Sequence, residues 1–177
     1  MLPNDYEEQN CTIARALEVI GERWTILIVR DAMLGIRRFE DFQARLGISR
    51  TILAARLAQL VEHGVLDRER YQRRPDRFEY VLTARGLELW PVIAGLAEWG
   101  TRHLTPDGTP PREFRHGACG TRVHAEVRCP HCDVDVKPED AVSVPTPAMP
   151  ISRAEHIHEP VLTALSQPRT LLEPVRG

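Results

Sequence analysis

Three of the four cysteines of this chain lie in one short stretch, "HGACGTRVHAEVRCPHC", which runs from residue 116 to residue 132. The stretch begins with the pair His116 and Cys119 and ends with the pair Cys129 and Cys132, each with a two-residue spacer. Zinc prefers four ligands in a tetrahedron, and such a spacer lets one tight turn present both side chains to the same ion. The pattern therefore predicts a structural zinc site of the zinc-ribbon type, with these four residues as its ligands.

The same stretch leaves alternatives open. His124 and His131 compete with His116 for the place of the fourth ligand. A metal-free alternative has reduced thiols, or a labile disulfide between Cys129 and Cys132. The nine residues between the two pairs alternate in polarity, which predicts a hairpin arm that links them. A zinc ion with four protein ligands has no open position for water, and the segment is too short to enclose a substrate, so we do not expect an enzyme.

The composition of the chain, which has 177 residues and a net charge of −2, limits the classes of protein to which it can belong. The absence of a run of eighteen apolar residues argues against a membrane-spanning helix, and the acidic first ten residues lack the apolar segment of a signal peptide. Cysteines clustered with histidines fit a reducing compartment, so we expect a cytoplasmic protein without a membrane partner. Residues 37–77 hold ten arginines against six acidic residues. Such a window is typical of phosphate binding, the alternative being a solvated charged face.

Apolar residues recur at helical spacing in four successive segments, each closed by a glycine. These segments are residues 12–21, 23–35, 37–47 and 48–64. Ser49 can cap the fourth, and the short connection around Gly47 predicts a helix-turn-helix. Four side chains of the fourth segment are expected to face the core: Ile52, Leu53, Leu57 and Leu60.

The spacing of apolar residues changes after this segment. Two extended runs between residues 65 and 83 surround a turn at Pro75, which predicts a β-hairpin. Thr83 can cap the next helix, residues 84–104, which Pro91 should interrupt. The sequence thus predicts a mainly α fold with a small β-hairpin wing, that is, a winged helix-turn-helix, plus a small zinc-ribbon-like appendage. The predicted boundaries are 1–104 for the helical domain, 105–115 for a linker, 116–143 for the ribbon and 144–177 for a proline-rich, partly disordered tail.

A winged helix of this kind indicates binding to double-stranded DNA. A recognition helix needs polar and basic side chains in its first turns, and a wing needs positive charge that follows phosphates. The candidate contacts are Arg38, Ser49, Arg50, Thr51, Arg56, Arg70, Arg73, Arg74 and Arg77. Ser49 has the alternative role of a helix cap only, and each arginine that of a solubilising residue.

Several motifs occur together and in order. They include "GERW", "RRFEDF", "LAQLVEHGVL", "FEYVLTARG" and "AEWG" within about residues 8–104. In these motifs the chain resembles the HxlR family of bacterial transcriptional regulators, which are related to MarR-type winged helices. The resemblance implies a homodimer that binds a pseudo-palindromic operator, with the terminal helices of the domain forming the dimer interface.

The fourth cysteine, Cys11, precedes the first predicted helix. In some members of the HxlR family the equivalent cysteine senses oxidants or electrophiles, so the resemblance implies a candidate sensor. The amides at a helix start stabilise a thiolate, whereas Glu7 and Glu8 oppose it. The alternative is a small apolar packing residue near a dimer interface.

We therefore expect a dimeric DNA-binding transcriptional regulator with a structural zinc, and with a small-molecule or redox effector as a further expectation. Two other functions remain open at this point. The winged helix could instead contact a protein, or the Cys/His cluster could act as a metal or redox switch.

Overall fold

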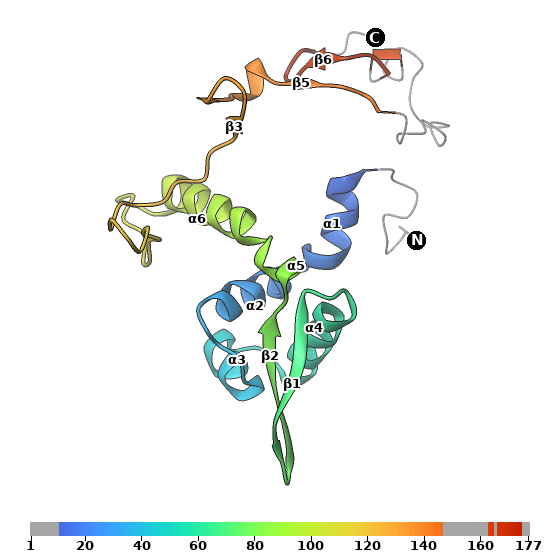
Figure 1. The fold of residues 1–177 in the computed structure, drawn as a ribbon, viewed down its shortest axis with the longest axis vertical. Coiled ribbons are helices and arrows are strands. Elements are labelled where there is room, and N and C mark those ends of the chain that lie inside the picture. The colour runs from blue at the N-terminus through green and yellow to red at the C-terminus, as the bar shows by residue number, and fades with distance from the viewer. Residues whose placement is uncertain (1–10, 147–162, 165, 175–177) are drawn as a thin grey trace. The chain divides into compact units, whose positions relative to one another are not determined.

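The computed structural model describes residues 11–146, 163–164 and 166–174 of the chain (Figure 1). It divides into two compact units, one formed by residues 16–125 and the other by the described residues before and after them. Among the described residues no helix is long and apolar enough to cross a membrane. The first ten residues, on which the signal-peptide prediction rests, lie outside the described residues.

The larger unit contains the helices and the long hairpin. In chain order its elements are α1 (Thr12–Ile20, which crosses the boundary between the units), α2 (Arg23–Met33), α3 (Phe39–Leu46), α4 (Arg50–Glu62), β1 (Leu66–Arg73), β2 (Asp76–Leu82), α5 (Ala84–Leu87) and α6 (Trp90–Leu104). The order of four helices, a hairpin, a short helix and a further long helix confirms the prediction of a mainly α fold with a β-hairpin wing.

A single apolar core holds these elements together. Fully buried side chains come from α2, α3, α4 and β1, and a nearly buried one comes from α6: Ile28, Val29, Phe42, Leu53, Leu57, Leu60, Leu66 and Ile93. Three of the four α4 residues predicted for the core are thus confirmed. The prediction for Ile52 is wrong, because its side chain is 41% exposed. Each helical step turns by about 100°, so the residue before Leu53 falls outside the inward stripe.

The connection between α3 and α4 is the short turn expected of a helix-turn-helix. Gly47 ends α3 with φ 65°, a left-handed conformation that glycine adopts without steric cost. Ser49 then caps α4, and its hydroxyl accepts a hydrogen bond from the Ile52 amide at 3.2 Å. The sequence pattern therefore predicted both the end of α3 and the start of α4.

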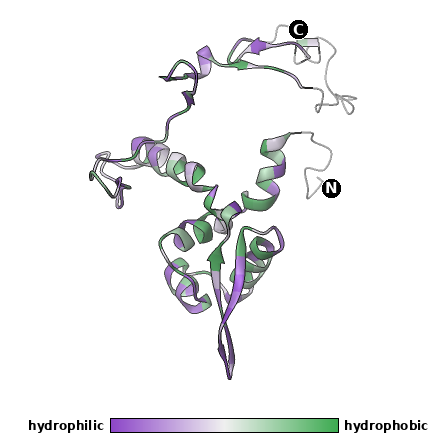
Figure 2. Ribbon diagram, in the orientation of Figure 1, coloured by the Kyte–Doolittle hydropathy of each residue, from purple (hydrophilic) through white to green (hydrophobic). Residues whose placement is uncertain are grey.

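The antiparallel hairpin of β1 and β2 pairs from Leu66 and Leu82 to Arg73 and Asp76, and its register shifts by one residue between Arg70 and Gln72. It projects beyond the helices in Figure 1, and its outer half is hydrophilic in Figure 2. A projecting tip has no core to cover, so its side chains need not be apolar. The hairpin is therefore a wing in the structural sense.

Proline interrupts the long C-terminal helix of this unit as predicted. Thr83 caps α5 by accepting a hydrogen bond from the Gly86 amide at 3.0 Å. The chain then restarts as α6, with Pro91 in the first turn, where its missing N–H is not needed. The observed break thus lies just before the proline, as its chemistry requires.

The segment that follows α6 has few hydrogen bonds between strands, but it packs back along this helix. The Phe114 ring packs edge-on against Trp90, with ring centroids 4.7 Å apart. Farther along, the carboxylate of Glu98 accepts hydrogen bonds from the Ala125 amide at 2.7 Å and from His124 Nδ1 at 3.1 Å. Residues 105–125 accordingly group with the helical unit.

The smaller unit consists of short paired strands. Strand β3 (Arg128–Cys129) pairs with β4 (Val134–Asp135), and β5 (Val142–Ser143) pairs with β6 (Arg169–Thr170), while η1 (Pro138–Asp140) is a short 3-10 helix. Residues 147–162, 165 and 175–177 of the predicted disordered tail lie outside the described residues.

Candidate nucleic-acid interface

The start of α4 presents polar side chains to the surface. Ser49, Arg50 and Thr51 are all exposed, and Ser49 is occupied as the helix cap. The Arg50 guanidinium lies over the Phe39 ring, 4.8 Å from its centroid, which orients the side chain without neutralising its charge. Exposed polar groups in the first turn of the second helix of a helix-turn-helix are where base edges are contacted.

Arg56 lies on a different face from the one expected for a DNA contact. Its side chain is 27% exposed, with one nitrogen 3.0 Å from Glu22 and another donating to Gln59 at 3.1 Å. Residues 53, 56, 57 and 60 share one helical face, so an arginine at this position faces the same side as the core leucines. Arg56 therefore ties α4 to the start of α2.

Arg38 connects the helix-turn-helix to the wing. Its guanidinium bonds the Glu79 carboxylate at 3.2 Å and lies over the Tyr71 ring, 4.8 Å from the centroid. The hydrogen bond with Glu79, and next the charge of Tyr71, raise the pKa of Arg38 above its ordinary value. The Arg38 side chain thus contacts both strands of the hairpin and is still 54% exposed, and its contact with DNA stays a prediction.

The outer half of the hairpin carries arginines without partners. Arg73, Arg74 and Arg77 are exposed, and no described residue forms an ion pair with any of them. Arg70 differs, since one of its nitrogens lies 3.5 Å from Asp76. Three uncompensated cations at one tip form a surface that attracts phosphate.

Sequence reasoning missed Arg68 in β1, whose guanidinium lies only 3.6 Å from the centroid of the Phe78 ring. Arg68 pairs with Tyr80 across the hairpin, so Phe78, two residues before Tyr80, is its diagonal neighbour on the same face of the sheet. Stacking covers the exposed face of an aromatic ring and stiffens the hairpin.

The pair His116 and Cys119 occupies a tight turn. His116 Nδ1 lies 3.3 Å from the Cys119 sulfur, and the Thr121 hydroxyl lies at the same distance from that sulfur. Hydrogen bonds from Thr121, and then from His116, lower the pKa of Cys119 to about 7. The imidazole and the sulfur thus converge, as two ligands of one ion must.

The pair Cys129 and Cys132 occupies the turn of a second hairpin, between β3 and β4. Hydrogen bonds from the backbone amides of Cys132 and His131 lower the pKa of Cys129. The prediction that the nine residues between the pairs form a hairpin arm is wrong, because the pairing lies around each turn: Arg115 bridges Arg122 in one and β3 pairs β4 in the other.

The two turns belong to different units of the structure. Among the described residues, no three His, Cys, Asp or Glu side chains gather closely enough to hold a metal ion. The four-ligand zinc site therefore stays a prediction. Of the two histidines that compete with His116 for the place of the fourth ligand, His124 forms a hydrogen bond with the Glu98 carboxylate through Nδ1.

Cys11 is exposed and carries a free thiol just before α1. Its carbonyl accepts a hydrogen bond from the Arg15 amide at 3.0 Å, so the residue occupies the position at which the helix begins. The thiol is accessible to a reactant.

A helix-turn-helix followed by a basic hairpin defines a winged helix-turn-helix of the DNA-binding class. The model of the HxlR-like helix-turn-helix family matches residues 19–108, and the chain belongs to this family. The family is one of DNA-binding transcriptional regulators rather than enzymes.

Three known proteins that are similar to this chain are all regulators or assigned as transcription factors. An uncharacterised HTH-type transcriptional regulator of Mycobacterium tuberculosis is 40% identical over 136 residues, which cover 77% of this chain and 86% of the relative. The crystal structure of PA1607, assigned as a transcription factor without an established function, has a TM-score of 0.68 and 36% identity and covers 76% of this chain and 94% of its own. The redox regulator HypR in its reduced form has a TM-score of 0.51 and 29% identity, covering 54% of this chain and 95% of its own.

Proposed function

We propose that this HxlR-like regulator binds a pseudo-palindromic operator as a homodimer. The observation that carries the proposal is the exposed, unpaired charge of Arg73, Arg74 and Arg77 at the tip of the wing. Phosphate contacts from the wing supply affinity and register, and Arg50 and Thr51 at the start of α4 read base edges.

An exposed apolar surface on α6 supports the dimer. Leu96 is 54% exposed, Trp99 57% and Leu104 72%, within a single helix. Soluble monomers rarely leave such a row of large side chains in water, so a second copy is the expected cover. A two-fold dimer places two α4 helices on half-sites about one helical turn apart, which requires a pseudo-palindrome.

The test selects binding sites from a random duplex library and measures the affinity for the selected site and for a scrambled one by fluorescence anisotropy. We expect two inverted half-sites. The Thr51 side chain has no hydrogen-bond partner among the described residues. The variant Thr51→Ala should therefore reduce the ratio of the two affinities by about tenfold, since a specific base contact is worth ~1–3 kcal/mol. Recovery of no enriched site at low salt would refute DNA recognition.

The dimer is tested separately by sedimentation equilibrium. Trp99→Glu places a charge on the exposed face of α6 and should convert a dimer into a monomer with an unchanged far-UV spectrum. Val134→Glu is a matched control, because Val134 is 54% exposed, close to the 57% of Trp99, but lies on β4. A monomeric native protein at micromolar concentration would refute the dimer.

We also propose that Cys11 makes operator binding responsive to oxidants. Its exposed thiol at the start of α1 and the similarity of the chain to the reduced form of a redox regulator support this role. Diamide should change the operator affinity of the native protein and not that of Cys11→Ser, while a Cys119→Ser variant keeps the response. An equal response in native protein and Cys11→Ser would refute it.

A further proposal concerns zinc. The convergence of His116 and Cys119, and the amide hydrogen bonds to the sulfur of Cys129, are the chemistry of two metal-binding turns. His116, Cys119, Cys129 and Cys132 would hold one structural zinc ion, which would stabilise the segment that contains both turns.

A further inference from the structure

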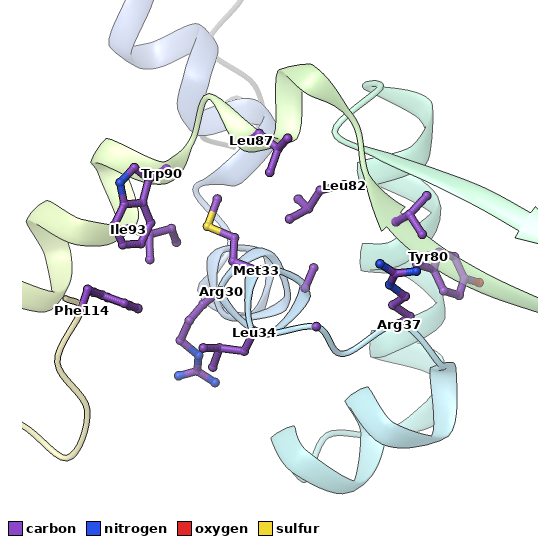
Figure 3. A pocket seen from close by; sticks show the side chains of 13 residues that line it. Arg30, Met33, Leu34, Arg37, Tyr80, Leu82, Leu87, Trp90, Ile93 and Phe114 are labelled. Atoms are coloured by element: carbon purple, nitrogen blue, oxygen red, sulfur yellow. The ribbon is translucent and has the colours of Figure 1, made fainter. Parts of the chain in front are cut away.

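A cavity of about 570 Å³ opens at the surface of the helical unit, between the end of α2, strand β2 and the start of α6 (Figure 3). This volume is typical of sites for small organic ligands. One wall comes from the segment after α6, because Phe114 packs edge-on against Trp90. The return of residues 105–125 along α6 therefore completes the cavity.

The lining of the cavity is mostly apolar and aromatic. In Figure 3, Trp90, Ile93 and Phe114 gather on one side, Tyr80 lies on the other, and Met33 lies between them. Flat aromatic walls and a flexible thioether accommodate a planar apolar body.

The charged residues of the lining are both cations. Arg30 and Arg37 line the cavity, and no aspartate or glutamate does. The Arg30 guanidinium is held 2.9 Å from Asp31, whereas no described residue pairs with the guanidinium of Arg37. The cavity therefore has a net positive charge, with one guanidinium free to form a bidentate pair with a carboxylate.

We propose that this cavity binds a small organic anion with an aromatic ring, whose carboxylate pairs with Arg37 and whose ring lies in the apolar lining between Tyr80 and Met33. Inorganic phosphate does not fit this lining, since it would leave the apolar walls without a partner. A neutral aromatic molecule would leave the Arg37 charge uncompensated.

The contacts behind the two arginines link the cavity to the DNA-binding elements. Asp31 is fully buried, and one of its oxygens accepts bonds at 2.9 Å from both Arg30 and Arg45, the latter on α3. An anion that draws Arg30 away leaves this buried carboxylate to Arg45 alone. Such a change acts on the helix that precedes α4.

Arg37 is linked to the wing through the backbone. Its carbonyl accepts a hydrogen bond from the Tyr80 amide at 2.8 Å, and its neighbour Arg38 holds Glu79 of the same strand. An anion bound at Arg37 thus acts where the base of the hairpin meets the start of α3. We infer that ligand binding changes operator affinity, a step that rests on the proposed DNA-binding function.

The test uses 2-naphthoate as the probe, with 2-naphthamide and acetate as matched probes that lack the charge and the ring. Binding is followed by calorimetry and by tryptophan fluorescence, without DNA. We expect 2-naphthoate to bind at least about fivefold more tightly than 2-naphthamide, as an accessible charge-assisted pair allows. Acetate should not bind detectably. Equal affinities for the acid and the amide would overturn the anion site.

Two variants locate the site. Arg37→Met keeps the aliphatic stem and should abolish the preference for the acid, whereas Arg85→Met, at an exposed arginine of α5, should keep it. Leu87→Trp fills the cavity from a position that is 57% exposed and should block both aromatic probes while the melting temperature is unchanged. Retention of the preference in Arg37→Met would overturn the assignment.

The link to DNA is measured last. Saturating 2-naphthoate should shift the operator affinity of the native protein at least threefold and leave Arg37→Met unshifted. Ligand binding with an unshifted operator affinity would overturn the link between the sites. Ligand binding in a protein that recognises no DNA would refute the proposed function while supporting the cavity, so the two failures are distinguishable.

Discussion

The strongest prediction concerns the variant in which Arg73, Arg74 and Arg77 are all replaced by alanine. These side chains are exposed and have no ion pair with any described residue, so their removal leaves no buried charge behind. The free energy of unfolding should change by less than ~0.5 kcal/mol, as is usual for such surface sites. Any loss of DNA affinity therefore reports on DNA contacts.

The magnitude follows from the number of cations. The variant removes three positive charges from each protomer, and each phosphate contact contributes about 0.9 to the slope of log affinity against log salt concentration. In a dimer whose six arginines all contact phosphates, the slope becomes shallower by ~5, and half as many contacts give ~3. The ratio of operator to scrambled affinity should change little, because phosphate contacts carry no sequence information.

The assay is fluorescence anisotropy with a labelled duplex between about 50 and 300 mM salt, the range in which counterion release dominates. The matched control replaces Arg23, Arg85 and Arg112, three exposed arginines outside α4 and the hairpin. It removes the same charge and should leave the slope within ~1 of the native value. Equal slopes in the two triple variants would refute the wing as the phosphate contact and leave only a nonspecific effect of net charge.

Three further predictions follow from contacts inside the protein. Asp31→Ala should lower the free energy of unfolding by ~3 kcal/mol in urea denaturation, since it leaves two arginines without their buried partner, and a loss below ~1 kcal/mol would contradict this. Hydrogen bonds from the Ala125 amide and then from His124 lower the pKa of Glu98. The ionised carboxylate of Glu98 therefore stabilises the folded protein above the ordinary carboxyl pKa of ~4.3, and this stabilisation is lost as pH falls through the pKa of Glu98 in the folded protein. Hydrogen exchange at Ala125 should therefore accelerate at acid pH in the native protein, and already at neutral pH in Glu98→Gln. Unaltered exchange in that variant would contradict the role of Glu98 in holding the Ala125 amide. Purified protein should contain about one zinc per chain by mass spectrometry, and Cys129→Ser should lose it, whereas a zinc content unaffected by this change would exclude the predicted ligand set.

The helices and the wing could be predicted because their signals are local. Gly47, Ser49, Thr83 and Pro91 act through their own backbone or through an amide three residues away, so each marks a boundary regardless of the rest of the fold. The arginines at the hairpin tip were equally predictable, since a turn between two strands has no core to enter.

The orientation of single residues within α4 was less predictable. A step of one residue turns the side chain by about 100°, so an apolar residue such as Ile52 can lie just outside the buried stripe, and Arg56 can lie within it. Hydrophobicity identifies the helix better than it identifies the edges of its buried face. The partner of Arg56, Glu22, is distant in sequence and carries no local signal.

The cavity was beyond sequence reasoning for a related reason. The return of residues 105–125 depends on Glu98 meeting the Ala125 amide and on Phe114 meeting Trp90, and neither pair has a helical or strand period. A proline-rich composition indicates a segment without helices or strands, but it does not indicate whether that segment packs.

The same returning segment joins two features that the sequence presented separately. It supplies the aromatic wall of the cavity at Phe114 and, a few residues later, the turn that carries His116 and Cys119. A backbone hydrogen bond spans this turn, in which the Val123 amide donates to the Phe114 carbonyl at 2.9 Å. A metal ion that tightens the turn therefore restrains the wall as well. Because a restrained wall has less conformational entropy left to lose, zinc should strengthen binding of an aromatic anion even though the ion does not touch it. Calorimetry with 2-naphthoate before and after chelation measures this coupling, and identical affinities would show that the turn and the cavity are independent.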